Sequence, residues 1–366
     1  MIAISGARGT GKTTFLLQTI KERFSITSPL QVLYASLDNL WFGSHTLVEL
    51  AEEFCKYGGK FLFLDEVHKY PGWSRELKNI YDTYSQLKIV FAGSSLLDIS
   101  RSEADLSRRV TLYAMAGMSF REYLNMTGHA LKPISLGNIL ERHLEISTDL
   151  NKQIEFPLLH FKDYLHKGYY PFFKEAGEFN PIQLAQIINV VLENDIPAVH
   201  PIEYPTILKI KKLLNLLAVS APVKPNITKL SRLVGVSRNY LVEFIHLLGQ
   251  ANLLHNVTAQ GQTFSILAKP EKIYFHNPNL YFALGENPTI GSLRETFFLN
   301  QLSVTHQVNY PGKGDFLVNE KYIFEVGGKK KDSRKIKDFD HSYIAADGIE
   351  YGIDNKIPLW LFGFLY

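Results

Sequence analysis

The sequence predicts an α/β fold that begins with a parallel sheet, and three observations lead to this class. Short apolar runs alternate with helical patterns in the first third of the chain. These runs show little alternation of polar and apolar residues, which is typical of parallel strands covered on both faces. A glycine-rich loop joins the first run to the first helical pattern. The five runs are Ile2–Ser5, Val32–Leu37, Phe61–Leu64, Ile89–Ala92 and Val110–Tyr113.

The composition excludes several classes of protein. The chain has 366 residues, of which 46% are hydrophobic, so it can build the cores of two or three domains. The net charge of 39 − 36 = +3 is too small to indicate nucleic-acid binding without a local patch. Cys55 is the only cysteine, which excludes a disulfide framework and a four-cysteine zinc site. No apolar run approaches the ~18 residues of a membrane span, and the N-terminus lacks a signal-peptide pattern. We therefore expect a cytoplasmic protein without a membrane partner.

The glycine-rich loop matches the phosphate-binding pattern GxxxxGK[ST] in full. A strand (Ile2–Ser5) precedes it and a helix (Thr13–Glu22) is predicted after it. Glycines let backbone N–H groups approach phosphate oxygens, and the new helix presents further N–H groups. Lys12 would reach the β- and γ-phosphates, and the Thr13 hydroxyl would ligate Mg²⁺. We expect ATP and Mg²⁺ as ligands; a glycine-rich turn that matches by chance is the alternative. The predicted nucleotide-binding residues are Gly6, Ala7, Arg8, Gly9, Thr10, Gly11, Lys12, Thr13 and Thr14.

Two acidic residues end the third predicted strand. Phe61–Leu64 runs directly into Asp65 and Glu66, which is the Walker B arrangement. Such strand ends are where ligands bind in open α/β sheets. We expect Asp65 to hold Mg²⁺ through water and Glu66 to polarise the attacking water as a general base. A solvated strand end is the alternative.

Ser94 follows the next strand, Ile89–Ala92, which we expect to lie between the two Walker strands. Its hydroxyl could orient the attacking water or the γ-phosphate. The alternative is a simple helix cap.

Several blocks of this sequence resemble a family of bacterial and archaeal AAA-superfamily ATP-binding proteins with a C-terminal domain of unknown function. The blocks are GARGTGKTTFL, Leu64–Asp82, Val90–Ile99, Leu106–Val110, Ser119–Leu124 and Tyr164–Phe173. The resemblance covers the whole chain. It implies a P-loop ATPase core of AAA type (1–118), a helical lid or connector (119–204), a winged-helix segment (205–262) and a restriction-nuclease-like α/β domain (263–366).

The resemblance also implies roles for individual side chains. One arginine after the sensor region, Arg109 or its neighbour Arg108, would contact the γ-phosphate in cis or in a neighbouring subunit of a homo-oligomer. An ordinary surface ion pair is the alternative for Arg109. Trp73 is expected to be a packing anchor, and His68 either signals nucleotide state or is structural.

A helix-turn-helix pattern lies in the winged-helix segment. Asn226 can cap a helix Ile227–Leu233, Gly235–Ser237 makes a tight turn, and Arg238–Leu248 forms a second helix. The second helix would present Arg238, Asn239, Glu243 and His246. Only one of these is a fixed cation, so contact with DNA or RNA and contact with an unknown protein partner both remain open.

Three carboxylates suggest a second site near the C-terminus. A turn at Asn319–Lys321 would pair Gly314–Val318 with Tyr322–Val326 and set Asp315 opposite Glu325, since 315 + 325 = 2 × 320. Opposed carboxylates repel unless a cation neutralises them, and Mg²⁺ would do so. Glu295, on a predicted helix Ser292–Leu302, could add a third carboxylate. This order of acids resembles the PD-(D/E)xK nucleases.

Gly327 stands where that nuclease family carries its catalytic lysine. Lys313, which faces residue 327 in the same register, or Lys329 could replace it. A binding fold that does not cleave is the alternative. The basic run Lys329–Lys337 could follow a nucleic-acid backbone or be the solvated face of the helix predicted after it.

The hypothesis is an ATP-binding, ATP-hydrolysing switch that drives or gates its C-terminal domains. The alternatives are a metal-dependent nuclease and a binding module that uses ATP as a structural ligand.

Overall fold

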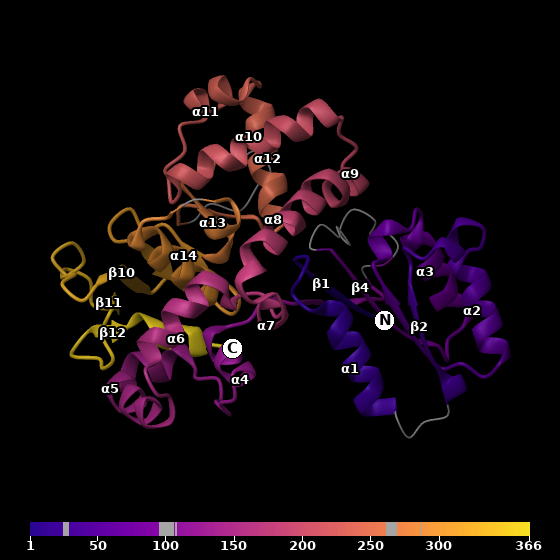
Figure 1. The fold of residues 1–366 in the computed structure, drawn as a ribbon, viewed down its shortest axis with the longest axis horizontal. Coiled ribbons are helices and arrows are strands. Elements are labelled where there is room, and N and C mark those ends of the chain that lie inside the picture. Colours follow the sequence, from indigo (N-terminus) through magenta and orange to yellow (C-terminus); the bar gives the residue numbers. More distant parts are fainter. Residues whose placement is uncertain (25–28, 95–105, 107, 261–268, 286) are drawn as a thin grey trace. The chain divides into compact units, whose positions relative to one another are not determined.

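The computed structural model describes residues 1–24, 29–94, 106, 108–260, 269–285 and 287–366 (Figure 1). The chain forms two compact units, which we call unit 1 and unit 2. Unit 1 contains Met1–Ala116 and Val190–Glu203, and unit 2 contains Gly117–Asn189 and Tyr204–Tyr366. The predicted boundary at residues 262 and 263 lies outside the described residues, and the division into four domains stays a prediction.

The five predicted strands of unit 1 are all present and form one parallel sheet. Their order is β2-β3-β4-β1-β5, so β4 lies between the two Walker strands β3 and β1, as predicted. The loop after β1 and the acids of β3 therefore lie at the same carboxyl edge of the sheet. The strands are β1 (Ile2–Gly6), β2 (Val32–Ser36), β3 (Phe61–Asp65), β4 (Lys88–Ser94) and β5 (Thr111–Ala114).

Helices cover both faces of this sheet. Successive residues of a strand point to opposite faces, and on β3 Phe63 packs with Leu16 of α1, whereas Leu62 and Leu64 join a separate cluster with Leu77 of α3. Trp73 packs beside Phe91, as expected of a packing anchor. The helices are α1 (Lys12–Phe24), α2 (Leu47–Lys56) and α3 (Trp73–Thr83), with short 3₁₀ helices η1 (Pro29–Gln31), η2 (Leu40–Gly43) and η3 (Val67–Lys69).

A short second segment completes unit 1. It contains a π-helical turn, η6 (Val191–Asp195), followed by α9 (Ile196–Val199). Ile196 is fully buried, and α9 packs on η3, which follows the Walker B strand. A residue of this distant segment can therefore reach the carboxyl edge of the sheet.

Unit 2 begins with helices, as predicted for the chain after Ser119. Ser119 and Glu122 form a capping box at the start of α4. Asn279 donates to the carbonyls of Tyr164 and Leu165 at the start of a π-helical turn, η4 (Tyr164–Gly168). Before residue 254, the helices of unit 2 other than η4 are α4 (Phe120–Met126), α5 (Leu136–Gln153), α6 (Pro157–Asp163), α7 (Phe173–Ala176), η5 (Gly177–Phe179), α8 (Asn180–Val190), α10 (Tyr204–Ser220), α11 (Ile227–Val234) and α12 (Arg238–Gln250).

The two helices of the predicted helix-turn-helix are confirmed as α11 and α12. Asn226 accepts a hydrogen bond from the Lys229 N–H, and Gly235 ends α11 with a left-handed φ of 81°. The strands β6 (Leu254–Val257) and β7 (Lys272–Phe275) pair antiparallel after α12. The winged-helix assignment stays a prediction.

The second sheet of unit 2 is mixed and has the order β12-β11-β10-β9-β8. Its strands β9 and β10 pair through Phe316↔Phe324 and Val318↔Tyr322, so the predicted register, with each pair summing to 640, is confirmed. Asn319 and Glu320 form the turn with φ values of 52° and 56°. The elements are α13 (Asn279–Ala283), α14 (Ile290–Ser303), β8 (Val308–Asn309), β9 (Phe316–Val318), β10 (Tyr322–Gly328), β11 (Ser342–Asp347), β12 (Lys356–Pro358) and the 3₁₀ helix η7 (Leu359–Phe364).

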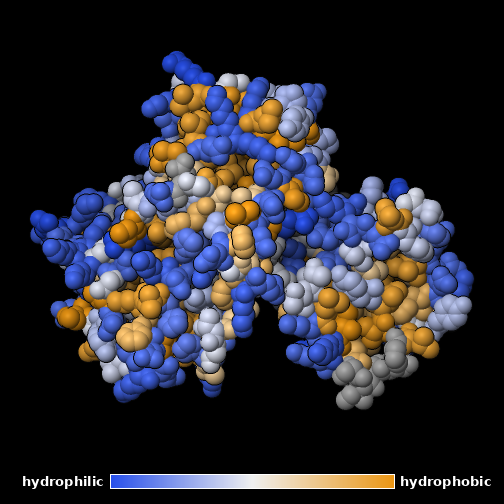
Figure 2. Space-filling model, viewed as in Figure 1, coloured by the Kyte–Doolittle hydropathy of each residue, from blue (hydrophilic) through white to orange (hydrophobic). Residues whose placement is uncertain are grey.

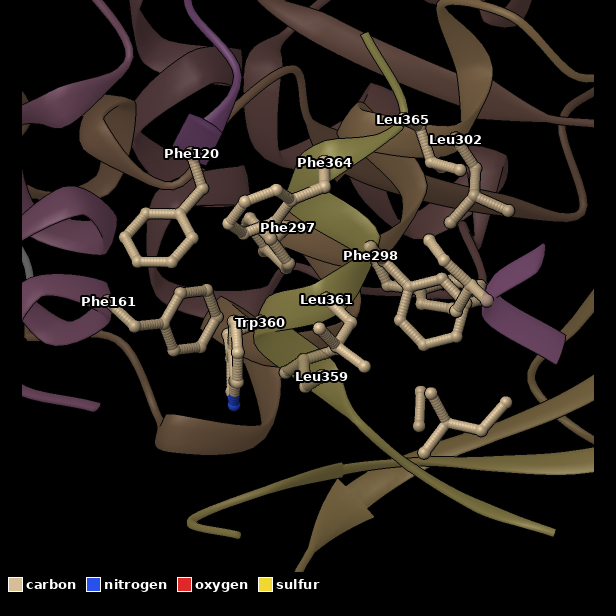
Figure 3. Packing of buried hydrophobic residues seen from close by; sticks show 14 of the residues in the cluster. Phe120, Phe161, Phe297, Phe298, Leu302, Leu359, Trp360, Leu361, Phe364 and Leu365 are labelled. Carbon is tan, nitrogen blue, oxygen red and sulfur yellow. The ribbon is translucent and has the colours of Figure 1, made fainter. Parts of the chain in front are cut away.

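An aromatic core joins the helices and the sheet of unit 2. Figure 3 shows η7 in the middle of this core, with Phe120 and Phe161 to its left and Phe298 and Leu302 of α14 to its right. The rings of Phe161 and Phe297 lie 4.7 Å apart, edge to face. This packing holds α14, which carries Glu295, against the second sheet.

Two surface features bear on the sequence predictions. The basic run Lys329–Lys337 forms turns rather than a helix, so the predicted helix after it is wrong; Ile336 anchors these turns in a small core with Leu317 and Ile323.

Figure 2 shows apolar atoms among the hydrophilic ones on the visible face. None of the helices in the described ranges is long and apolar enough to cross a membrane.

Candidate functional site: a phosphate loop with a Walker B acid pair

The phosphate loop adopts a conformation that only glycines tolerate without strain. Gly9 and Gly11 have φ values of 87° and 95°. A Cβ at Gly6 would lie 2.5 Å from the Met115 carbonyl oxygen, so this position also requires glycine. The Lys12 ammonium donates to the carbonyls of Gly6 and Ala7, both at 2.9 Å, and burial lowers its pKa. The lysine is thus held across its own loop.

The Thr13 hydroxyl and the Asp65 carboxylate are brought together as predicted. Thr13 Oγ1 donates to Asp65 Oδ2 at 2.5 Å, and the Tyr34 hydroxyl donates to the same oxygen at 3.1 Å. Burial and then the nearby Asp65 charge raise the pKa of Tyr34, so it stays a donor. Tyr34 was not predicted as part of this site, because a tyrosine in an apolar strand carries no signal of its partner.

Glu66 has an unusual backbone conformation. Its φ of 50° is left-handed, which costs a residue with a Cβ of the order of 1–3 kcal/mol. The preceding Asp65 carboxylate accepts from the Glu66 N–H at 2.9 Å and holds this turn. The Glu66 side chain is 24% exposed, and its Oε2 lies 3.4 Å from Nε2 of the buried His68. Glu66 is thus half-buried at the strand end, where a water molecule can reach it.

Asp195, from the second segment of unit 1, joins the phosphate loop to the residues after Asp65. Arg8 forms a two-pronged ion pair with it, through Nε at 3.1 Å and Nη2 at 3.2 Å. Lys69 Nζ donates to Oδ1 at 2.9 Å, and His68 Nε2 lies 3.7 Å from Oδ1. Burial alone would raise the pKa of Asp195, but nearby His68 and the hydrogen-bonded Arg8 and Lys69 outweigh burial and lower that pKa. Sequence reasoning missed Asp195.

The other two predicted residues of this site lie in different places. Ser94 pairs in register with Gly6, beside the start of the phosphate loop, but its side chain lies outside the described residues. Arg109 forms a two-pronged ion pair with Asp82, and its carbonyl accepts from the N-terminal amino group of Met1. Because Met1 precedes β1 and the phosphate loop follows β1, Arg109 lies at the opposite edge of the sheet. The surface ion pair is what the structure has, and a role in a neighbouring subunit stays a prediction.

The residues of unit 1 fit a magnesium–nucleotide complex. Mg²⁺ prefers oxygen ligands and usually takes one or two from protein and the rest from phosphates and water. The Thr13 hydroxyl and the Asp65 carboxylate supply two such oxygens beside the phosphate loop. The loop's left-handed glycines and the first turn of α1 would present N–H groups to the phosphates.

The three carboxylates of the predicted second site are near one another but already neutralised. Glu295 accepts from the Tyr274 hydroxyl at 2.9 Å and lies 3.4 Å from Lys272 Nζ. Burial and then the charge of Asp315 raise the pKa of Glu295. In the described part of the chain, no group of three or more acidic, histidine or cysteine side chains is close enough to hold a metal ion. These residues therefore do not fit a three-carboxylate metal site as they lie.

The cation between the opposed carboxylates is Lys331, which the sequence analysis did not consider. Its Nζ lies 2.5 Å from Oε2 of Glu325 and 3.7 Å from Oδ2 of Asp315. A Cβ on Gly327 would lie 2.7–2.9 Å from three carbons of Lys331, so the glycine makes room for this side chain. The lysine beside the two carboxylates is thus Lys331, four residues after Gly327, and a catalytic role for Lys313 or Lys329 stays a prediction.

Comparisons with known proteins agree with this geometry at the family level. Residues 1–124 match the family model described as "AAA domain". Residues 158–290 match the model described as "Domain of unknown function (DUF8612)". An uncharacterized protein of Methanocaldococcus jannaschii is 27% identical over 389 residues, covering 98% of this chain and 81% of that protein.

A solved structure titled "Structure of Drosophila ORC bound to DNA" aligns with 79% of this chain and 90% of that chain at 12% identity and a TM-score of 0.28, too weak a likeness to support an argument. The nuclease resemblance stays a prediction. With the five-stranded parallel sheet and its phosphate loop, the match of residues 1–124 identifies an AAA-type P-loop domain in the N-terminal third of the chain.

Proposed function

We propose that unit 1 binds Mg·ATP and hydrolyses it. The observation that carries the proposal is the contact between the Thr13 hydroxyl and the Asp65 carboxylate, directly beside a complete phosphate loop. Thr13 and Asp65 are 52 positions apart in sequence, yet their side chains lie within hydrogen-bonding distance. P-loop ATPases use a hydroxyl and a carboxylate of this kind to hold the metal ion.

Each side chain has one task in the reaction. Lys12 exchanges its two loop carbonyls for β- and γ-phosphate oxygens, and Thr13 and Asp65 hold Mg²⁺. Mg²⁺ held by these residues would neutralise charge on the phosphates. Glu66 accepts a proton from the attacking water while the oxygen of that water bonds to the γ-phosphorus. The bond from that phosphorus to the β–γ bridging oxygen breaks, which leaves ADP and inorganic phosphate.

The test measures nucleotide binding and phosphate release separately. Calorimetry should show Mg·ATP binding to the wild type and to Glu66→Gln, and none to Lys12→Ala. Phosphate release by Glu66→Gln should fall at least about 100-fold, the usual lower bound for losing a general base. Glu52→Gln, which breaks an exposed ion pair to Lys56 on α2, is the matched control and should change neither value. Absence of wild-type binding at millimolar Mg·ATP would reject the proposal.

The same experiment separates hydrolysis from a structural use of ATP. A binding module would gain about 2.7 kcal/mol of stability from ATP at a hundredfold excess over its Kd. It would release no phosphate in either the wild type or Glu66→Gln.

In this proposal the nucleotide state gates unit 2 and its partner. Arg238, Asn239 and Glu243 are exposed on α12, and Lys329 and Lys330 are exposed on the turns after β10. A nucleic acid bound there should raise phosphate release. Its association constant should fall about tenfold for each phosphate contact when the salt concentration is raised tenfold. A salt-independent stimulation by protein alone would favour a protein partner.

A second candidate is metal-dependent cleavage of nucleic acid by unit 2. The placement of Lys331 between Glu325 and Asp315 favours it, although the carboxylates do not fit a metal site as they lie. Cleavage of plasmid DNA or single-stranded RNA with Mg²⁺ or Mn²⁺, lost in both Asp315→Ala and Lys331→Ala, would support it. The absence of cleavage by the wild type on every substrate would reject it.

A further inference from the structure

The buried Asp195 carboxylate is the part of unit 1 that the proposed hydrolysis does not use. Its side chain is 1% exposed, yet it belongs to a segment 187 residues away from the loop that it contacts. Burying a carboxylate is costly unless cations and hydrogen bonds compensate it. Arg8 and Lys69 provide that compensation through three contacts of 2.9–3.2 Å. The structure therefore holds two cations and one anion in a shared cluster.

The two cations come from the two loops that frame the phosphate site. Arg8 lies inside the phosphate loop, between Gly6 and Lys12, and Lys69 comes four positions after Asp65. Both follow strands that are only one strand apart, at the same edge of the sheet. A guanidinium and an ammonium converging on one point are the groups that bind a phosphate in proteins. Here they converge on a carboxylate of the same chain.

Asp195 is also next to the proposed base. His68 Nε2 lies 3.7 Å from the Asp195 carboxylate and 3.4 Å from Glu66 Oε2. A change at Asp195 can therefore reach Glu66 through a single side chain.

We propose that Arg8 and Lys69 recognise the terminal phosphate of ATP and that Asp195 competes with that phosphate for both cations. The inference rests on the proposed function, since it requires ATP in the phosphate loop. A terminal phosphate carries more charge and more oxygens than a carboxylate, so it is the stronger partner for both cations. ADP lacks this group and leaves the Asp195 cluster in place. ATP, and not ADP, then loosens residues 190–203 from the phosphate loop.

The first test is the ratio of affinities for ADP and for a non-hydrolysable ATP analogue, measured by calorimetry on the full chain. Asp195→Asn keeps the shape but removes the competing charge. It should tighten binding of the ATP analogue about tenfold, a typical coupling between two competing ligands, and leave ADP binding within about twofold. Arg8→Ala should weaken the analogue about tenfold and leave ADP unchanged. Glu52→Gln is the control, because it breaks an ion pair on α2.

Other outcomes would overturn the inference. If Asp195→Asn leaves the ratio unchanged or weakens both nucleotides equally, Asp195 is a structural brace. If Arg8→Ala weakens both nucleotides equally, Arg8 supports the loop and does not read the third phosphate.

A second measurement uses the wild type and does not depend on the variants folding. Amide hydrogen exchange of residues 190–203 should become faster with the Mg²⁺-bound ATP analogue and stay unchanged with Mg·ADP. Slower or unchanged exchange with the analogue, at saturating concentration, would overturn the inference. If the wild type binds neither nucleotide, the proposed function fails; if it binds both and the segment does not respond, only this inference fails.

Discussion

Replacing Lys331 by methionine should destabilise unit 2 by about 2–3 kcal/mol. Glu325 is 1% exposed, and Lys331 lies 2.5 Å from its carboxylate and 3.7 Å from that of Asp315, so the change leaves a buried negative charge with a second carboxylate nearby. Breaking a fully buried pair costs about 3–5 kcal/mol. The Lys331 side chain is 29% exposed, so water can partly replace the ammonium, and we therefore expect a cost below that range. Methionine keeps the apolar stem in the space beside Gly327.

Urea unfolding followed by tryptophan fluorescence would measure this loss in unit 2. The chain has three tryptophans, and Trp360, buried in the aromatic core, is the one in unit 2. A background with Trp41→Phe and Trp73→Phe therefore reports on unit 2 alone. Lys330→Met, an exposed neighbour, is the control and should stay within about 0.5 kcal/mol of the parent.

A double variant decides whether the uncompensated charge is the cause. Adding Glu325→Gln to Lys331→Met removes the buried charge and should restore most of the lost stability, to within about 1 kcal/mol of the parent. The reasoning is refuted if Lys331→Met matches Lys330→Met, or if Glu325→Gln makes the Lys331→Met variant less stable still.

Three further predictions concern other residues. Burial lowers the pKa of His255 to about 4, and burial with neighbouring His255 lowers that of His276 to about 3, both from 6.5. Both side chains are neutral in the folded protein and bind a proton more readily in the unfolded chain, so their contribution to stability is present above pH 6.5 and is lost as the pH falls toward their folded pKa values. We expect each histidine to lower the free energy of unfolding by roughly 1–2 kcal/mol between pH 7 and pH 5. In urea unfolding, His255→Gln should lose less stability than the wild type over that pH range. Asn279→Ala should cost about 2–4 kcal/mol in urea unfolding, since it leaves the carbonyls of Tyr164 and Leu165 without their donor, whereas the exposed Asn138→Ala should be neutral. Gly327→Ala should displace Lys331 and reduce thermal stability in the same direction as Lys331→Met, and an unchanged melting temperature would contradict the assigned contact.

Local patterns were sufficient for most of the fold. Each strand of the first sheet is a short apolar run. Burial on both faces explains that signature for the central strand β3, whereas the edge strand β5 is apolar but exposed. The hairpin register followed from one turn at Asn319 and Glu320, because side chains in strands alternate with a fixed period of two. The phosphate loop and Asp65 were predictable because backbone geometry fixes their residue types and their place after a strand.

The residues that sequence analysis missed depend on contacts between distant segments. Asp195 lies in a helical stretch with no motif, and its partners Arg8 and Lys69 are more than a hundred residues away. Lys331 was missed because the chain turns back after Gly328, which brings a later side chain over Gly327. The ion pair of Arg109 with Asp82 likewise depends on which edge of the sheet each residue reaches. Patterns of composition and spacing contain no information on such pairings.

The discontinuous make-up of unit 1 has a practical consequence for anyone who trims the gene. A fragment that stops at residue 124, where the family match ends, would omit residues 190–203 and with them Asp195. Arg8 and Lys69 would lose their shared counter-ion, and η3 would lose its packing against α9. Such a truncated product would be a poor stand-in for the intact protein in nucleotide assays, whereas grafting the missing stretch back through a short linker should recover its behaviour.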